Sequence, residues 1–448
     1  MNAIEPIIKS VLDQDLYSFT VGQVAFKEFP TARVTYEFIN RGKTQFPEGF
    51  ADELKRQVKI MSLLAMNNDE YDYMDALGFF SYDYLQFLKQ FRFDPAELDI
   101  IQEGGELTVI FTGLWESAIM WEVPFLALVS ELYYIMTGKT LDPEWHNRLV
   151  AKTANLSNNG CKWMEFGTRR RFSAAVQDAV VKEQMGWAGF LGTSNVFLAR
   201  KYGVKCLGTM SHQGPMAMQA LYGATLCNKE WRAVWEKVYP DKLLTYLPDT
   251  VTTDVFLRDF TREEALKWNL RQDSGDPDVW LKKILGFYKD NGIDSNIKTA
   301  VLSDSLNDFK AVDYTRRFSA RINIVLGIGT FLSNDCGHPP LNMVVKLIEA
   351  DFGDGMRPVV KLSDTSGKYT GDPEAIAETK AELFLPLTDD ERFRLMSAVA
   401  PDELWGTFVA DRWDHENARN VLLHYIRQKR LTGDCLKWLN QNFPCYFD

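Results

Sequence analysis

The alternation of strand-like and helical segments after about residue 150 most constrains how this chain can fold. Short apolar runs are separated by segments with helical spacing, and polar or glycine residues follow the runs. Such alternation is typical of a parallel sheet with helical crossovers, either closed into a barrel or open and doubly wound. In both architectures, binding sites lie at the carboxyl ends of the strands. The residues that follow each run are therefore the first candidates for a functional site.

The expected elements divide the chain into two patterns. The first third is α+β, with strands expected over 32–41, 105–113 and 116–123 and mostly helices over 48–91. The later part carries the alternation, and a helical tail is expected over 388–440. The segments that carry the alternation are strands at 203–210, 241–250, 296–305, 321–330 and 341–350, with helices at 173–185 and 306–318.

Charge and composition narrow the class of protein. The formal net charge of the 448-residue chain is −11, which argues against a general partner of nucleic acid or anionic membranes. Glu122, Pro124 and Glu131 interrupt the longest apolar stretch, so no membrane span is expected. The N-terminus lacks a signal-peptide pattern. The six cysteines form no C-x-x-C pair, and we expect free thiols in a cytoplasmic protein.

His212 is the candidate for nucleophilic chemistry. It is one of five histidines and follows a predicted strand in the small-residue turn CLGTMSHQGPM. Nearby loops supply Asp249 and Asp254, and a carboxylate can fix an imidazole tautomer and raise its nucleophilicity. Spacing alone supports a catalytic and a structural His212 equally.

Two turns before helices have the composition of anion sites. In EFGTRRRFS (165–173), an arginine could bind carboxylate or phosphate while Phe166 stacks on a flat ligand, or the arginines could begin a solvated helix. The amides of the turn 192–195 suit an anion, although its Ser194 and Asn195 also belong to ordinary helix caps.

Two later loops suggest phosphate and ribose binding. In RQDSGDPD (271–278), Arg271 could bind phosphate and Asp273 could bind ribose hydroxyls or Mg²⁺, or the segment could be an ordinary turn. Gly327 and Gly329 follow a strand and could form a phosphate-binding nest. Two glycines by themselves are only a weak indication of such a nest. The sequence has no P-loop, no histidine or cysteine metal motif and no G-x-S-x-G elbow.

Ten segments, in order, resemble the signatures of the nicotinate phosphoribosyltransferase family. They span residues 13–364 and read DQDLYSFT, YEFINR, EFGTRRRFS, GFLGTSNVFLARKYG, LGTMSHQ, YLPDTVTTDVF, RQDSGDP, SDSLND, GIGTFLSND and VVKLSD. The resemblance implies an α/β fold in which an irregular, TIM-like α/β barrel (126–349) packs against an α+β domain. That second domain would consist of residues 1–125 and be completed by residues 350–448.

The resemblance also implies an activity and a set of site residues. Nicotinate and phosphoribosyl pyrophosphate would give nicotinate mononucleotide and pyrophosphate, with ATP hydrolysis coupled through phosphohistidine at His212 and Mg²⁺ on the pyrophosphate. Phe166 would sandwich the pyridine ring together with Tyr17 from the other subunit of a homodimer, and Arg169 would meet the carboxylate. The other implied residues are Asp249 at the histidine, Arg271 and Asp273 for phosphate and ribose, Asp304, Gly327, Gly329 and Thr330 for ribose and 5′-phosphate, and Arg41, Lys361 and Lys368 for pyrophosphate or ATP.

Two positions refine these expectations. The related nicotinamide enzymes carry an aspartate where Ser194 stands, so Ser194 favours the acid as substrate, with the amide as the alternative. A silent binding protein that kept the fold is the alternative from another class. Gln213 departs from the family, which usually has glutamate after the histidine, and this departure bears on how His212 is tuned for ATP coupling.

Overall fold

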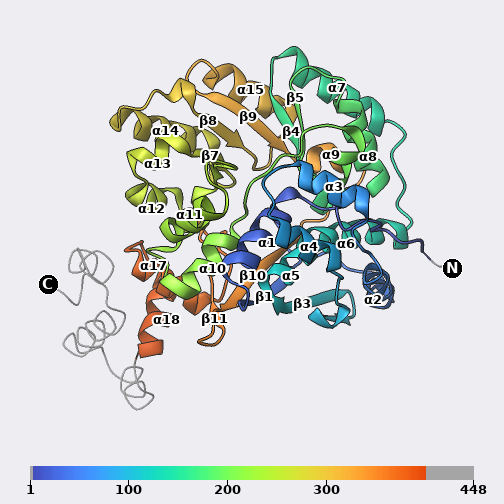
Figure 1. Cartoon of the computed structure of the whole chain (residues 1–448), viewed down its shortest axis with the longest axis horizontal. Helices are drawn as coiled ribbons and strands as arrows, with labels where there is room; N and C mark the ends of the chain where they lie inside the picture. The colour runs from blue at the N-terminus through green and yellow to red at the C-terminus, as the bar shows by residue number, and fades with distance from the viewer. Residues whose placement is uncertain (1–3, 400–448) are drawn as a thin grey trace.

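The structure is a computed structural model that describes residues 4–399 and contains two β-sheets (Figure 1). The parallel sheet has the strand order β5-β4-β9-β8-β7-β6, and the antiparallel sheet has the order β11-β10-β1-β3-β2. The parallel strands are β4 (Trp163–Glu165), β5 (Phe190–Thr193), β6 (Thr245–Tyr246), β7 (Asn269–Gln272), β8 (Thr299–Leu302) and β9 (Asn323–Ile328). The antiparallel strands are β1 (Arg33–Ile39), β2 (Leu98–Glu103), β3 (Glu106–Leu114), β10 (Val344–Asp351) and β11 (Arg357–Pro358). The expected α/β fold with a second α+β domain is confirmed.

The parallel sheet curls toward an irregular barrel. Thr193 of β5 forms an isolated parallel bridge with Cys206, and the Thr209 hydroxyl donates to the Thr245 carbonyl oxygen of β6 over 2.7 Å. The strand expected over 203–210 is reduced to this bridge. Gly203 and Gly208 interrupt it, because their φ angles of +63° and +135° do not continue an extended strand.

Helices surround both sheets, and Figure 1 shows the barrel helices on the outer side of the parallel strands. The helices of the first domain are α1 (Leu16–Glu28), α2 (Phe50–Met61), α3 (Asn68–Ala76), α4 (Tyr82–Gln90), α5 (Trp115–Ala118) and α6 (Glu122–Met136). The barrel region carries α7 (Trp145–Asn158), α8 (Ala174–Gln184), α9 (Val196–Tyr202), α10 (Gln213–Tyr222), α11 (Cys227–Val238), α12 (Thr253–Asp259), α13 (Arg262–Lys267), α14 (Pro277–Asp290), α15 (Asp308–Phe318) and α16 (Thr330–Ser333). The last helices are α17 (Pro373–Glu382) and α18 (Asp389–Val399), and the remainder of the expected helical tail lies outside the described residues.

Two strand expectations need correction. The strand expected over 116–123 is wrong, because this segment forms α5, a 3₁₀ turn (Ile119–Trp121) and the start of α6. Most of its side chains are buried, so its apolar residues show no spacing that would distinguish a strand from a helix. The strand expected near 341–350 exists as β10, but it pairs antiparallel with β1. The chain therefore returns to the first domain at Val344 and not at residue 350.

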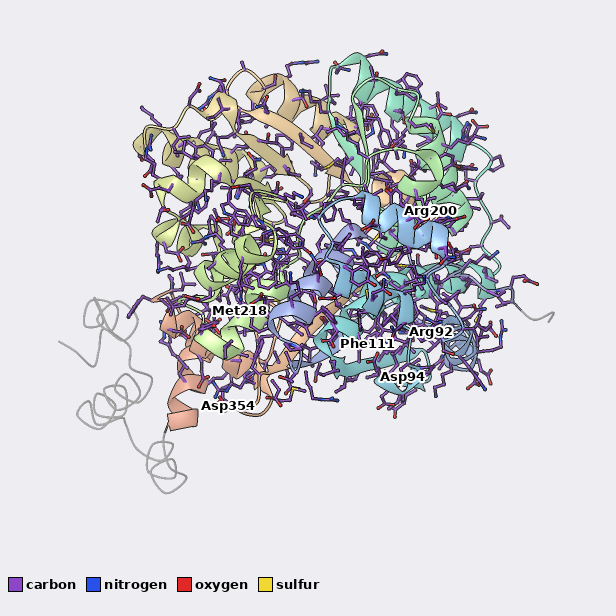
Figure 2. All side chains as sticks on the ribbon, in the orientation of Figure 1. Arg92, Asp94, Phe111, Arg200, Met218 and Asp354 are labelled. Carbon is purple, nitrogen blue, oxygen red and sulfur yellow. The ribbon has the colours of Figure 1, made fainter. Side chains whose placement is uncertain are left out.

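The segment Trp115–Met136 forms the central core of the first domain. It is long and apolar enough to cross a membrane by length and composition, but 78% of its most apolar window is buried inside the protein. Such burial is typical of a core helix. Figure 2 labels Phe111 of β3 and Met218 of α10, two buried residues of the continuous apolar core.

Candidate active site

A pocket of about 50 Å³ lies where the carboxyl ends of the parallel strands meet the first domain. Barrel residues and residues of α1, α6, β1 and β10 line it together. The lining residues are Tyr17, Tyr36, Glu122, Arg169, Met210, Ser211, His212, Gln213, Met216, Leu247, Arg271, Asp273, Val345, Lys346 and Leu347. Five of them are site residues predicted from the sequence, namely Tyr17, Arg169, His212, Arg271 and Asp273.

His212 lies directly before α10, 6% exposed, among charged side chains. Its Nε2 lies 3.1 Å from Asp273 Oδ2, 2.9 Å from Lys361 Nζ and 3.5 Å from Asp249 Oδ1. Its Nδ1 lies 3.1 Å from the Thr250 hydroxyl. Burial, and next the Lys361 ammonium, lower the pKa of His212 below its ordinary value, while the two carboxylates oppose them. The imidazole is therefore neutral at pH 7 and keeps a lone pair.

Backbone hydrogen bonds dock the Lys361 segment beside the histidine. The Leu362 and Ser363 amides donate to the carbonyl oxygens of Thr250 and Asp249 over 2.7 and 3.1 Å. Lys361 Nζ then lies 3.0 Å from Asp249 Oδ2. Burial opposes ionisation of Asp249, but Lys361 and His212 outweigh it and lower the pKa of this carboxyl.

Asp254, the other carboxylate expected near the imidazole, is in a different place. Its side chain is 68% exposed and pairs with Lys283 over 2.7 Å. Asp254 follows the Thr252 helix cap at the start of α12, and the helix carries its side chain outward. Asp249 and Asp273 are the carboxylates that the fold brings to His212.

Arg271, Asp273 and Ser303 connect the ends of β7 and β8. Arg271 Nη2 donates to Asp273 Oδ1 over 3.0 Å, and its Nε donates to the Ser303 hydroxyl over 2.8 Å. Burial disfavours the charge on Asp273, but Arg271, His212 and Lys361 outweigh it and hold its pKa well below the usual value. Asp273 therefore stays ionised between the arginine and the histidine.

The two glycines after β9 make room for Phe166. A Cβ at Gly327 would meet the Phe166 ring at 2.7 Å, and one at Gly329 would meet the Phe166 carbonyl oxygen at 2.9 Å. Neither glycine has the positive φ that a nest of alternating backbone requires. The nest interpretation is therefore replaced by close packing. The Phe166 ring also stacks on Arg271, whose guanidinium carbon lies 5.2 Å from the ring centroid.

The three consecutive arginines have three different environments. Arg169 lines the pocket. The pKa of Arg170 is lowered to about 10, first by burial and then by the nearby positive charges of Arg169 and Arg41. Arg171 is 1% exposed and donates to both carboxylate oxygens of Asp13 over 2.7 and 2.8 Å. Arg171 is thus a structural residue of the interior, and Arg169 is the one of the three that lines the pocket.

The loop that carries Phe166 and Arg169 is held by Glu165. The Glu165 carboxylate accepts from the Gly167 amide at 2.5 Å, from Thr193 at 2.6 Å and from Gln177. Burial raises the pKa of Glu165 to about 7, although these hydrogen bonds oppose the shift. Thr193 and its neighbours in the turn 192–195 therefore serve this buried network, and Asn195 also caps α9 through the Leu198 amide.

Ser194 does not leave this region without a carboxylate. Its hydroxyl donates to Asp15 Oδ1 over 2.7 Å, and Asp15 is buried. Ser194 itself is not among the pocket-lining residues. Asp15 thus places a carboxylate beside Ser194 from another segment of the chain, and the preference for the acid stays a prediction.

Tyr17 lines the pocket of its own chain, beside Arg169 and Glu122. Burial, and next the Glu122 carboxylate, raise the pKa of Tyr17 well above its ordinary value. That a second subunit supplies a Tyr17 to this site stays a prediction. The single chain already brings Tyr17 to the pocket, because α1 docks on the barrel through the Leu16 amide, which donates to the Ser194 carbonyl over 2.8 Å.

The remaining expected residues lie in the loops around the site. Arg41 Nη2 reaches the Thr370 hydroxyl at 3.5 Å, and an isolated bridge pairs Lys361 with Thr370. Lys368 is exposed in the same loop. Asp304 follows β8 and accepts from the Ser305 hydroxyl, and Thr330 begins α16. Between residues 4 and 399, no group of three histidine, cysteine or carboxylate side chains gathers as a metal site.

Sequence reasoning missed Glu122, Lys346 and Tyr36, which reach the pocket from the first domain. Burial raises the pKa of Glu122, and burial with nearby Lys361 lowers the pKa of Lys346 to about 8. One signal was visible: Glu122 is a carboxylate within a long apolar run, where a charge is costly unless it is paired. Tyr36 belongs to the signature YEFINR, whereas no comparable signal distinguished Lys346.

Comparisons with known proteins agree with this arrangement. The family model of the nicotinate phosphoribosyltransferase (NAPRTase) family matches residues 161–387, and that of its N-terminal domain matches residues 12–130. A nicotinate phosphoribosyltransferase of Desulforapulum autotrophicum is 40% identical over 83% of this chain and 97% of its own length. One from Escherichia coli is 39% identical over 85% of this chain and 96% of its own length.

Solved structures are similar as well. The crystal structure of nicotinate phosphoribosyltransferase from Porphyromonas gingivalis has a TM-score of 0.82 and 37% identity, covering 84% of this chain and all of its own. The enzyme from Vibrio cholerae has a TM-score of 0.81 and 29% identity over 88% of this chain and 98% of its own.

Proposed function

Because the chain belongs to the nicotinate phosphoribosyltransferase family, we propose that it joins nicotinate to the phosphoribosyl group of phosphoribosyl pyrophosphate. The products are nicotinate mononucleotide and pyrophosphate, a reaction of NAD biosynthesis. The observation that carries this proposal is the pocket itself, in which Arg169 lies beside Tyr17 at the carboxyl ends of the parallel strands.

Each part of the substrate has a matching group. Phe166 and Tyr17 offer aromatic surfaces to the pyridine ring, and the Arg169 guanidinium suits a planar carboxylate. Arg271 and Asp273 adjoin Phe166 and supply charge for phosphate and ribose. Transfer at the anomeric carbon builds positive charge on the sugar, so positioning and charge neutralisation carry the catalysis.

ATP coupling through His212 is the finer part of the proposal. The neutral imidazole attacks the γ-phosphorus of ATP, so that a P–N bond forms as the bond to ADP breaks. Lys361, 2.9 Å from Nε2, offsets the added negative charge. The ring proton stays on Nδ1, beside the Thr250 hydroxyl, and Asp249 and Asp273 stabilise the positive charge that the ring gains. Mg²⁺ bound with the pyrophosphate would neutralise its oxygens, and Asp273 of the Arg271 loop would be available to hold it.

The assembly and the cellular location remain predictions. We propose a homodimer in the cytoplasm, as the family resemblance implies. Tyr17 lines the pocket of its own chain, and the homodimer would add the Tyr17 of the other subunit to the ring site. Mass measurement in solution tests the oligomeric state separately from activity.

Parallel assays with nicotinate and nicotinamide, each with and without ATP, test the substrate. We expect turnover of the acid and stimulation by ATP, and a strong preference for the amide would contradict the proposal. Incubation with γ-labelled ATP tests the coupling. Acid-labile, base-stable label on the wild-type chain supports phosphohistidine. Absence of label would contradict ATP coupling through His212 but not the proposed transferase activity.

A further inference from the structure

Gln213, the residue after His212, connects the start of α10 to the first domain. Its side chain is buried between β1, α5 and α6. Gln213 Oε1 accepts from the Tyr36 hydroxyl at 2.5 Å and from Trp115 Nε1 at 3.3 Å. Gln213 Nε2 donates to Glu122 Oε2 at 3.2 Å.

The orientation of this amide follows from its partners. The Trp115 indole can only donate, so the amide oxygen faces it and the NH₂ group faces Glu122. The carboxylate of Glu122 therefore receives a hydrogen bond while it is ionised. Its other oxygen, Oε1, lies 3.6 Å from Arg169 Nη1. A continuous chain of polar contacts thus links Gln213 through Glu122 to Arg169.

Glu122 is the charged anchor of Arg169. Within residues 4–399, Arg169 forms no other salt bridge. An arginine side chain has many rotamers, so holding one of them in advance increases affinity for a planar anion. Glu122 is 6% exposed, and a buried carboxylate acts as an anchor only while it remains ionised.

We propose that Gln213 and Glu122 are positioning residues for recognition of the substrate's carboxylate. Glu122 orients Arg169. Arg169, Lys346 and the Tyr17 hydroxyl favour ionised Glu122 against burial and Asp15, and the Gln213 amide adds a hydrogen bond to the carboxylate. This inference rests on the proposed function, because it concerns the same pocket. It assigns the departure at position 213 to the nicotinate side of the site and not to the phosphorylated histidine.

A glutamate at position 213 would change the charge of the pair. Two carboxylates would face each other where the amide now meets Glu122, and such a pair holds one shared proton. With the proton on residue 213, that side chain donates as the amide does. When the proton leaves at higher pH, the two carboxylates repel and Glu122 moves from its position at Arg169.

The experiment measures KM for nicotinate and kcat between pH 6 and 8.5. For Gln213→Glu we expect KM near wild type at pH 6 and a rise of about tenfold at pH 8.5, with kcat within about twofold. For Glu122→Gln we expect a KM about tenfold higher at every pH, because an amide NH₂ would face the guanidinium. KM for phosphoribosyl pyrophosphate stays unchanged in both.

The double variant Gln213→Glu/Glu122→Gln distinguishes repulsion between two carboxylates from a structural disturbance at these positions. The amide introduced at position 122 can donate to the carboxylate introduced at position 213, so the pH dependence disappears. Its oxygen then faces Arg169, so KM for nicotinate falls below that of Glu122→Gln. Gln45→Glu, the same change at an exposed position, serves as the matched control and should behave as wild type. A merely structural role would lower thermal stability without creating this pH dependence.

Several results would overturn the inference. A lower KM for nicotinate in Glu122→Gln would mean that Glu122 competes with the substrate for Arg169. A pH-independent KM in Gln213→Glu, or a loss confined to kcat, would equally contradict it. Calorimetric titration of the wild-type protein with nicotinate distinguishes failure of the positioning role from failure of the proposed function. No binding and no turnover of nicotinate by wild type refutes both, whereas normal wild-type behaviour with unaltered variants refutes only the positioning role.

Discussion

The ammonium nitrogen of Lys361 lies 2.9 Å from Nε2 of His212, so a cation from the loop after β11 contacts the candidate nucleophile. After burial, this contact is the main reason that the pKa of His212 is lowered. A histidine with a lowered pKa holds its proton only at more acidic pH. Its lone pair is therefore available across the neutral range, as phosphorylation requires.

Lys361→Met should raise the pKa of His212. Asp249 and Asp273 would remain and favour the imidazolium, so the fraction of neutral ring at a given acidic pH would fall. We expect the acid limb of the pH profile for ATP-dependent labelling to move to higher pH, together with a loss in rate of about 10²-fold. Lys289→Met, at an exposed helix end, is the matched control. If the acid limb of this pH profile stays in place or moves to lower pH, Lys361 does not lower the pKa of His212.

His212→Ala should abolish phosphoryl-enzyme formation and the stimulation by ATP. Slow transfer without ATP should persist, because Arg169, Arg271 and Phe166 are untouched. The measurement pairs labelling from γ-labelled ATP with steady-state turnover. His146→Ala removes an exposed histidine far from the pocket and should change neither. Acid-labile label surviving in His212→Ala would place the phosphoryl group on another residue.

Arg169→Lys should weaken nicotinate binding with little change in stability. A lysine cannot form the paired hydrogen bonds that a guanidinium makes with a carboxylate, so we expect KM for nicotinate to rise by about 10²-fold. Arg171→Lys provides the contrast, because Arg171 forms a buried bidentate pair with Asp13. That change should lower the thermal midpoint in calorimetry. If Arg169→Lys alone were to unfold the protein, the ligand-binding role would lose its support.

Gly327→Ala should disturb the aromatic site. The new methyl group would meet the Phe166 ring at 2.7 Å, closer than carbon atoms approach. The ring must shift, and we expect KM for nicotinate to rise by about tenfold. Gly286→Ala is the control, since a Cβ there meets nothing within 4 Å, and alanine in α14 should add about 0.5–1 kcal/mol to the free energy of unfolding. Equal kinetics for the two variants would show that Phe166 does not clamp the ring.

The sequence predicted the α/β class, the parallel strands β6, β8 and β9, and many of the residues at the carboxyl ends of the sheet, but not the strands β4, β5 and β7. His212, Asp249, Arg271 and Asp273 converge as the motif order suggested, because parallel strands place their ends at one edge of a sheet. The errors fall where the local pattern has no period. The segment 116–123 is buried on every side and formed helix, and the apolar run at 344–351 fits either sheet until its partner β1 is known.

The sequence by itself determined which side chains stand at the strand ends and which residue types are available for the chemistry. Only the tertiary structure decided which of three adjacent arginines faces the pocket, and that Glu122 and Lys346 join it there. It also decided that Gln213 contacts Glu122, a residue 91 positions away, and Tyr36, 177 positions away. Local propensity cannot encode such contacts, because they exist only after two domains pack and exclude water between them. The physical reason is burial, since a buried polar group needs partners and the packing of distant segments selects them.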